Sequence, residues 1–368
     1  MTTARFTHPL DTLRQIALDV LRQAAAQGAS ACETDVSEGY GQTAVVRKGE
    51  VETIEFNKDK GIGVTTYVGQ RRGHASTSDF SRDALSRAVD KALAIARFTA
   101  EDDCAGLADA DLLARDIPDL DLHFAWDITV EAATELARAC ESAALAVDPR
   151  ITNSEGAGVS VQESQFVYAN SLGFMGGYPT SRHGISCAVI AEDDSGMQRD
   201  YWYTTARAAA DMDPVEAVGR RAGERTVRRL NARKLDTRQC PVLFEAPIAT
   251  GLIASYISAV SGGHLYRKSS FLLDSLGKQV FPGFMQIQER PFIKKGLASS
   301  PFDSEGVATR DRDVVKDGVV EGYFLSSYSA RKLAMQSTGN AGGNHNLIVP
   351  STGESFDELL KKMGTGLL

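Results

Sequence analysis

Hydrophobic residues near the start of the chain first recur at the spacing of an α-helix and then alternate as in β-strands. The helical positions are Leu13, Ile16, Ala17, Val20, Leu21 and Ala24, followed by a stop at Gly28. Alternating segments come next, with turn sequences at Lys48-Gly49 and at Asp59-Lys60-Gly61, and they predict a four-stranded antiparallel meander. A second helix, capped by Ser81, is predicted to follow.

The same order of elements is predicted a second time after an acidic connection over residues 101–127. It consists of a helix near 129–147, strands within 151–208, and a helix capped by Asp213 with Pro214 in its first turn. Turns are predicted at Asn170-Ser171, Gly176-Gly177 and Asp194-Ser195-Gly196. The order of elements suggests an architectural duplication, although the residues themselves do not repeat.

Beyond this point the pattern changes. The basic segment 220–234 fits a solvated helix face better than an anion site. Residues 240–247 predict a buried strand, and the apolar segment after them predicts a buried helix. Residues 313–329 predict a hairpin that turns at Asp317-Gly318. We therefore expect an α+β fold: a helix–sheet region over 1–100, a similar one over 101–235, and a β-rich domain over 236–368.

Composition narrows the class of protein. Of the 368 residues, 43% are hydrophobic and 24% charged, and the formal net charge of −8 argues against a nucleic-acid-binding protein. No window approaches the roughly 18 apolar residues of a membrane span, and the first 15 residues lack the apolar core of a secretory signal. The five cysteines are scattered singly, as in a protein with reduced thiols. These features predict a cytoplasmic protein.

Common catalytic motifs are missing from the sequence. None of the six histidines pairs with a nearby glutamate as in HExxH, and there is no Walker loop, GxSxG or GxGxxG. Two S-x-x-K tetrads, Ser275–Lys278 and Ser329–Lys332, would place a lysine one helical turn from a serine. A pattern with two fixed positions arises easily by chance, so surface or capping roles are favoured. A hydrolase using Ser329 and Lys332, or His345, stays open as an alternative.

Two polar segments are better candidates for function. The run STGNAGGNHNLIV combines Gly339, Gly342 and Gly343 with Asn344 and His345, and it is either a tight loop or the lining of a cleft for a peptide or partner. The stretch GLIASYISAVSGGHLYRKSS begins as an apolar helix that lacks groups able to do chemistry. It ends in His264 and the polar residues Arg267, Lys268, Ser269 and Ser270.

Many segments, in order, resemble the TldD/PmbA family, and specifically its PmbA (TldE) branch. They include GEVETIEFNKDKGIGVTTY, RITNSEG, ANSLGFMGGYPTSRH, YRKSSFLLDSLGKQV, KGLASSPFDSEGV and SSYSARKLAMQSTGNAGGNHN. The resemblance covers essentially the whole chain and implies two α/β regions followed by a β-rich C-terminal domain. Family members continue beyond MGTGLL, so the resemblance implies that this last domain is truncated.

The TldD branch carries an H-E-x-x-x-H zinc motif on a helix, followed by a similar basic and serine-containing run. The resemblance aligns that motif with residues 254–259, where this chain has Ala254, Ser255 and Ala259. None of the three can ligate zinc or act as a base, so the resemblance implies a chain without metal or cofactor. Zinc is expected in a TldD-type partner. If zinc were bound here, its ligands would have to come from His264, His345 and Cys240, whose spacing is unconvincing.

The resemblance implies the function of a non-catalytic subunit in a heterodimeric metalloprotease. Such pairs process or degrade unfolded peptides, for example precursors of modified-peptide antibiotics and antitoxins. Candidate peptide or partner contacts are Arg267, Lys268, Ser269, Ser270, Asn344 and His345. A homodimeric peptide-binding or chaperone-like module without catalysis is the main alternative.

Overall fold

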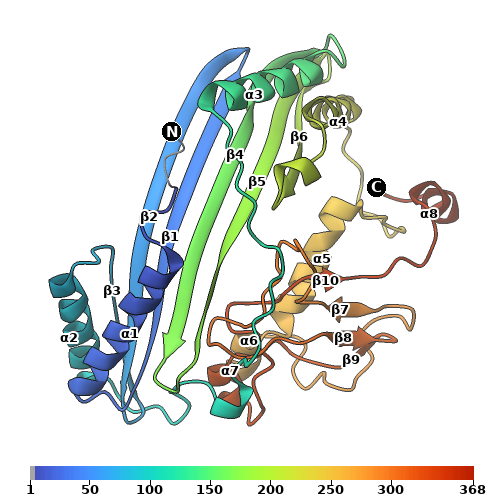
Figure 1. The fold of residues 1–368 in the computed structure, drawn as a ribbon. Coiled ribbons are helices and arrows are strands. Elements are labelled where there is room, and N and C mark those ends of the chain that lie inside the picture. The colour runs from blue at the N-terminus through green and yellow to red at the C-terminus, as the bar shows by residue number, and fades with distance from the viewer. Residues whose placement is uncertain (1–4) are drawn as a thin grey trace.

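A large antiparallel sheet dominates the computed structural model, which describes residues 5–368. Its six strands follow the order β3-β2-β1-β4-β5-β6, and Figure 1 shows them as a long curved wall. The strands are β1 (Ala31–Arg47), β2 (Glu50–Val68), β3 (Arg71–Thr77), β4 (Ile151–Asn170), β5 (Met175–Asp193) and β6 (Gly196–Ala206). The central pair β1 and β4 joins the first three strands to the last three.

Two pairs of helices cover one face of this sheet. The helices are α1 (Leu10–Ala26), α2 (Arg82–Phe98), α3 (Val130–Leu145) and α4 (Val215–Arg228). Helices α1 and α2 cover one end and α3 and α4 cover the other (Figure 1). Each half therefore consists of helix, three strands and helix, so the predicted duplication of architecture is confirmed. The two regions expected over 1–100 and 101–235 share this one sheet.

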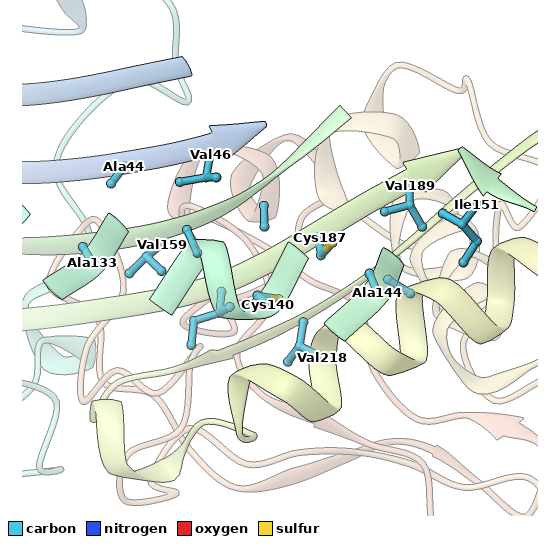
Figure 2. Packing of buried hydrophobic residues seen from close by; sticks show 14 of the residues in the cluster. Ala44, Val46, Ala133, Cys140, Ala144, Ile151, Val159, Cys187, Val189 and Val218 are labelled. Carbon is cyan, nitrogen blue, oxygen red and sulfur yellow. The ribbon is translucent and has the colours of Figure 1, made fainter. Parts of the chain in front are cut away.

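The helices lie close to the sheet because small residues line the contact. Cys140 and Ala144 of α3 pack with Val218 of α4 on Cys187 of β5, as Figure 2 shows. The α3–α4 contact needs a glycine, since a Cβ at Gly219 would overlap the carbonyl oxygen of Cys140. Protein interiors are packed as densely as organic crystals, so this side of the sheet has little room for larger side chains.

The C-terminal part has shorter elements around its own core. Its helices are α5 (Ala246–Ala259), α6 (Gly262–Tyr266), α7 (Ser327–Lys332) and α8 (Phe356–Met363). Its sheet, in the order β10-β7-β8-β9, contains β7 (Ile287–Glu289), β8 (Arg312–Lys316), β9 (Val319–Val320) and β10 (Leu347–Ile348). Short 3-10 turns, η1 (Ala110–Leu112) and η2 (Ala209–Asp211), lie in the connections. The predicted α+β class, with mixed helices and antiparallel sheets, is confirmed.

The C-terminal part rests on the face of the large sheet that the four helices leave open. Phe302 packs edge-on against Phe174 and Tyr178, and it lies 6.1 Å, between ring centroids, from Phe166. The Tyr178 hydroxyl is also 2.7 Å from the Ser300 Oγ. This aromatic contact places the loops of the C-terminal part over the strands β4 and β5.

Two predicted turns are wrong because they lie inside strands. Asp59-Lys60-Gly61 continues β2, so the first half has three strands in place of four. Gly176-Gly177 lies in β5, where a Cβ at Gly176 would collide with Phe302 and one at Gly177 with the Phe166 carbonyl. These two glycines serve close packing and not chain reversal.

Other local predictions have mixed outcomes. The Ser81 hydroxyl caps α2, Gly28 ends α1 with φ of 90°, and Asp317-Gly318 forms the turn between β8 and β9. Helix α4 is capped at Pro214 without a side-chain hydrogen bond, so the predicted Asp213 cap is wrong. Residues 240–247 do not form a buried strand, since only a single bridge joins Val242 to Leu367.

The predicted burial of the apolar helix is also wrong. In α5 only Tyr256 and Ala259 are buried, whereas Ile248 and Leu252 are 58% and 52% exposed. An apolar helix normally buries its apolar faces, and here the described chain covers only one of them. No helix within residues 5–368 is long and apolar enough to cross a membrane.

Candidate functional site

The glycine-rich loop lines a cleft of about 300 Å³ on the open face of the large sheet. One side of the cleft is aromatic, formed by Phe166, Tyr168, Tyr178 and Phe302. The other side contains Gly342, Gly343, Asn344 and His345, together with residues 298–300 and 303–304. The structure thus brings two predicted site residues, Asn344 and His345, to one cleft.

His345 is held in place by a buried carboxylate. Its main-chain N–H donates to Glu289 Oε1 at 2.8 Å, and its Nδ1 lies 3.0 Å from the same oxygen. Asn340 donates to this oxygen as well, and Arg312 Nε donates to Glu289 Oε2 at 2.7 Å. Asn344 is exposed, and its side-chain amide donates to the carbonyl oxygen of His345. The imidazole therefore anchors the loop.

The charge on Glu289 is stabilised by these contacts. Burial alone would raise the pKa of this carboxyl, but the hydrogen bonds from His345 and the charge of Arg312 lower it to about 2. An ionised Glu289 keeps four hydrogen bonds in the interior, so the loop, β7 and β8 are tied together at one point. Buried charges are tolerated when they are paired and hydrogen-bonded in this way.

Asp303 fixes the other end of the loop. Its carboxylate accepts hydrogen bonds from the main-chain N–H groups of Ala341, Glu305 and Val307. Burial raises the pKa of Asp303 to about 6, although these hydrogen bonds oppose the shift. The pKa of Asp303 therefore lies closer to neutral pH than that of an ordinary aspartate.

The three residues of α5 predicted to align with the zinc motif do not offer a set of metal ligands. Ala254 and Ser255 are exposed and Ala259 is buried. The only polar side chain among them, Ser255, donates its hydroxyl to the Gly251 carbonyl. Zinc sites use thiolate, imidazole or carboxylate ligands, and α5 offers none at these positions. Within residues 5–368 no three His, Cys, Asp or Glu side chains are grouped as metal ligands.

The polar run after α5 folds back onto that helix. His264 Nδ1 lies 2.8 Å from the Ser258 carbonyl oxygen, and Ser270 donates to the Ala259 carbonyl at 2.6 Å. These contacts satisfy carbonyl groups at the helix C-terminus. Arg267 and Lys268 are exposed, so their charges lie at the surface. The Ser269 hydroxyl donates to the His264 carbonyl oxygen. None of residues 267–270 lines the cleft, so their role in peptide or partner contact stays a prediction.

The S-x-x-K tetrads do not have the geometry of a serine–lysine pair. Ser329 makes its side-chain hydrogen bonds with Ser326 in the cap of α7, whereas Lys332 Nζ donates to Asp102 at 2.9 Å. That hydrogen bond raises the pKa of Lys332, so the ammonium form is favoured and no neutral amine is at hand to accept a proton from Ser329. Ser275 is buried outside any helix, and Lys278 is exposed. The hydrogen bonds do not support the hydrolase alternative.

Three residues that matter for the cleft were missed in the sequence. Asp303 lies in a segment quoted only for its family resemblance, and Glu289 and Arg312 lie outside the segments that were singled out. Glu289 carried a signal, because it occupies the same strand face as the fully buried Ile287, two residues before it. An acidic residue that shares a strand face with a core residue is expected to be buried, and a buried acidic residue indicates a partner of opposite charge.

Three family models match successive parts of the chain. They are described as the PmbA/TldA metallopeptidase domain 1 over residues 32–96, central domain over 125–230, and C-terminal domain over 237–368. Metalloprotease PmbA of Escherichia coli is 49% identical over 336 residues, which cover 91% of this chain and 75% of the relative. The PmbA homologue of Haemophilus influenzae is 48% identical and covers 97% and 79%, respectively.

Solved structures show the same fold. A Bacteroides thetaiotaomicron protein named as a candidate modulator of DNA gyrase superposes with a TM-score of 0.91 at 24% identity, over 97% of this chain and 82% of the other. TldE from Thermococcus kodakarensis gives 0.81 at 16% identity, over 96% and 81%. Since two relatives near one-half identity and three domain models agree, the chain belongs to the TldD/PmbA metallopeptidase family, in its PmbA (TldE) branch.

Proposed function

We propose that this chain is the zinc-free subunit of a two-subunit metallopeptidase that acts on unfolded peptides. The observation that carries the proposal is α5. It stands where the family's zinc helix is expected, yet its aligned positions are Ala254, Ser255 and Ala259. Because this helix has no ligand groups, we assign it a structural role. In this proposal it completes the site of a zinc-bearing TldD-type subunit. A TldD homologue of Haemophilus influenzae is 23% identical over 307 residues.

The exposed apolar side of α5 supports association with such a subunit. Ile248 and Leu252 lie one turn apart on the helix and are both more than half exposed, and Phe244 just before the helix is 44% exposed. Contiguous exposed apolar residues are typical of protein interfaces. The partner would bury this side of α5 and present its own zinc helix close by.

The cleft beside the glycine loop supports peptide handling. Its aromatic side can pack an apolar side chain, and Gly342 and Gly343, both with positive φ, allow close approach of a peptide backbone. Asn344 is exposed at the edge of the cleft and can bond a peptide amide. In this proposal Asn344 and the run 267–270 contact the peptide or the partner, and His345 holds the loop.

The test is association with a TldD-type subunit, measured by native mass spectrometry. We expect a one-to-one complex with the unchanged chain and loss of that complex for Leu252→Asp, because a carboxylate cannot be buried at an apolar contact without a partner. The matched control is Ile95→Asp on α2, which is 47% exposed on another surface and should still form the complex. Equal association of the L252D and I95D variants would contradict the proposed interface.

A second candidate, a homodimeric peptide-binding module, is favoured by a free sheet edge. Strand β3 pairs only with Ile62–Val68, so residues 50–61 of β2 have no neighbour on their outer edge within the described chain. Free strand edges pair readily with another chain. The same mass spectra separate the two candidates: a homodimer that persists when the TldD-type subunit is in excess would favour the second.

A further inference from the structure

A second cavity, of about 1070 Å³, lies at the end of the large sheet away from α3 and α4. Side chains of three strands form its floor: Glu33 of β1, Tyr67 of β2, and Arg72 and His74 of β3. Residues 99–106 and part of α7 form its walls, with Glu305 beside them. Of the candidate residues discussed above only Lys332 lines this cavity, where it pairs with Asp102, and the lining is mainly polar.

Glu33 is a partly buried carboxylate on the cavity floor, and tyrosine hydroxyls hold it in position. The hydroxyls of Tyr67 and Tyr168 donate to its two oxygens at 2.9 and 2.7 Å. Burial raises the pKa of Glu33 and the negative charge of Glu305 adds to the rise, while the tyrosine hydrogen bonds and the charge of Arg72 oppose it. Within residues 5–368 neither Glu33 nor Glu305 forms an ion pair. Each carboxylate oxygen can accept more than one hydrogen bond, so lone pairs stay available.

Glu305 lines the same cavity and also keeps lone pairs that can accept further hydrogen bonds. Its Oε2 accepts the main-chain N–H of Ser327 at 2.8 Å. Ser327 is only 4% exposed, and its hydroxyl has no hydrogen-bond partner among the described residues. A buried hydroxyl without a partner costs free energy unless another group satisfies it. The Ser327 main chain therefore holds Glu305 in place, and the other lone pairs of this carboxylate stay free.

Hydrogen bonds and ion pairs hold the walls of the cavity in place. Tyr328 and Lys332 of α7 both donate to Asp102, at 2.7 and 2.9 Å. The Lys332–Asp102 pair cancels its own charge, and Arg71 pairs in the same way with Glu101. Of the remaining lining residues, Glu33, Asp103 and Glu305 are acidic and Arg72 is basic, so the cavity keeps a negative excess.

From these contacts we infer that the cavity binds an organic cation with a primary ammonium group, held between Glu33 and Glu305. An ammonium has three donors, which match the free lone pairs of the two carboxylates, and the rings of Tyr67 and Tyr328 line the same space. A metal ion fits less well, since no three metal-ligating side chains are grouped within residues 5–368. This site goes beyond the proposed function, because it belongs to this chain alone.

The ammonium can come from a free diamine or from a lysine side chain of a peptide, and titration calorimetry on the full chain distinguishes them. The probes are cadaverine, the capped peptide acetyl-Ala-Lys-Ala-amide, and the same peptide with norleucine in place of lysine. We expect the lysine peptide or cadaverine to bind, and the norleucine peptide to bind at least about tenfold more weakly, because it lacks the charge. Stronger binding of cadaverine than of the lysine peptide identifies a small free amine as the ligand.

Variants locate the site. Glu305→Gln should weaken binding of the tighter probe by about tenfold or more, whereas Glu224→Gln, at an exposed carboxylate on α4 outside the cavity, should leave it unchanged. Circular dichroism checks that both variants fold, and if the E305Q variant does not, the lysine–norleucine contrast in the unchanged protein decides. Measurable and equal binding of the lysine and norleucine peptides, binding unaffected in the E305Q variant, or no binding of either amine would overturn the inference.

Discussion

The two faces of the molecule are stabilised in different ways. The helix-covered side of the large sheet relies on long strand ladders and on close packing of small apolar residues. The C-terminal part has strands of two to five residues, and buried charges hold its loops. Of the eight non-glycine residues with positive φ within residues 5–368, five lie after residue 260. The comparison teaches that the loops around the cleft depend on a few specific hydrogen bonds, whereas the sheet depends on many similar contacts.

The largest expected effect is at Glu289. Glu289→Gln removes the charge that Arg312 and His345 share, and a buried guanidinium is left without its partner. Breaking a buried ion pair on one side typically costs roughly 3–5 kcal/mol. Urea denaturation should show this loss for the E289Q variant, and no comparable loss for Glu321→Gln, a control at an exposed carboxylate. Equal stabilities of the two variants would mean that the charge network does not hold the C-terminal part.

The loss of stability at acidic pH should also depend on Glu289. The folded pKa of Glu289 is about 2, below the unfolded value of about 4.3, so its contribution is present above the unfolded pKa and is lost as the pH falls through the folded one. We expect the advantage of the unchanged protein over the E289Q variant to shrink between pH 4.5 and 2, by about 3 kcal/mol in total. Denaturation midpoints across this range measure it, and an advantage independent of pH would show that the charge is not its source.

Two identical substitutions contrast the packed core with the open helix face. Gly219→Ala would force a Cβ into the Cys140 carbonyl, and overpacking of this kind costs about 1–3 kcal/mol. Gly251→Ala on α5 meets no atom within 4 Å and should stabilise the helix by about 0.5–1 kcal/mol. Thermal melts of both variants test the contrast. If G251A destabilises the chain as much as G219A, that face of α5 is already packed in solution.

The smallest effect concerns the connection between the two parts. Residues 231–239 are all exposed and carry Arg233, Lys234 and Arg238, and the predicted domain boundary lies just there, at 235–240. Limited trypsin digestion should cut first within this segment, since exposed connections are preferred sites of proteolysis. Mass spectrometry of the first fragments identifies the cut. A first cut inside either part would place the boundary elsewhere.

Much of the fold could be predicted from periodicity, and the errors have physical causes. Helices α1 to α4 and the hairpin at Asp317-Gly318 follow from local signals that agree with their packing. Gly176 and Gly177 look like a turn, but their reason is the close approach of Phe302 and of the β4 backbone, which no local pattern contains. The exposure of α5 was likewise missed, because apolar composition predicts burial without saying what covers the helix.

The candidate site was predicted only in part. The glycine-rich run identified Asn344 and His345, and both line the cleft. The partner of His345, Glu289, lies 56 residues earlier in the chain, and Arg312 completes the cluster from a further segment together with Asn340 of the run itself. Contacts between such distant segments arise from the tertiary fold, so sequence spacing does not reveal them. The same holds for Glu33 and Tyr168, which are 135 residues apart.

The central claim is that this chain assists zinc chemistry performed by another subunit. The most direct measurement combines metal analysis with peptide cleavage, for this chain alone, for a TldD-type subunit alone and for the pair. We predict zinc only in the TldD-type subunit, cleavage of an unfolded peptide by the pair, and loss of cleavage on adding a chelator. Stoichiometric zinc in this chain, or chelator-resistant cleavage by this chain alone, would contradict the account.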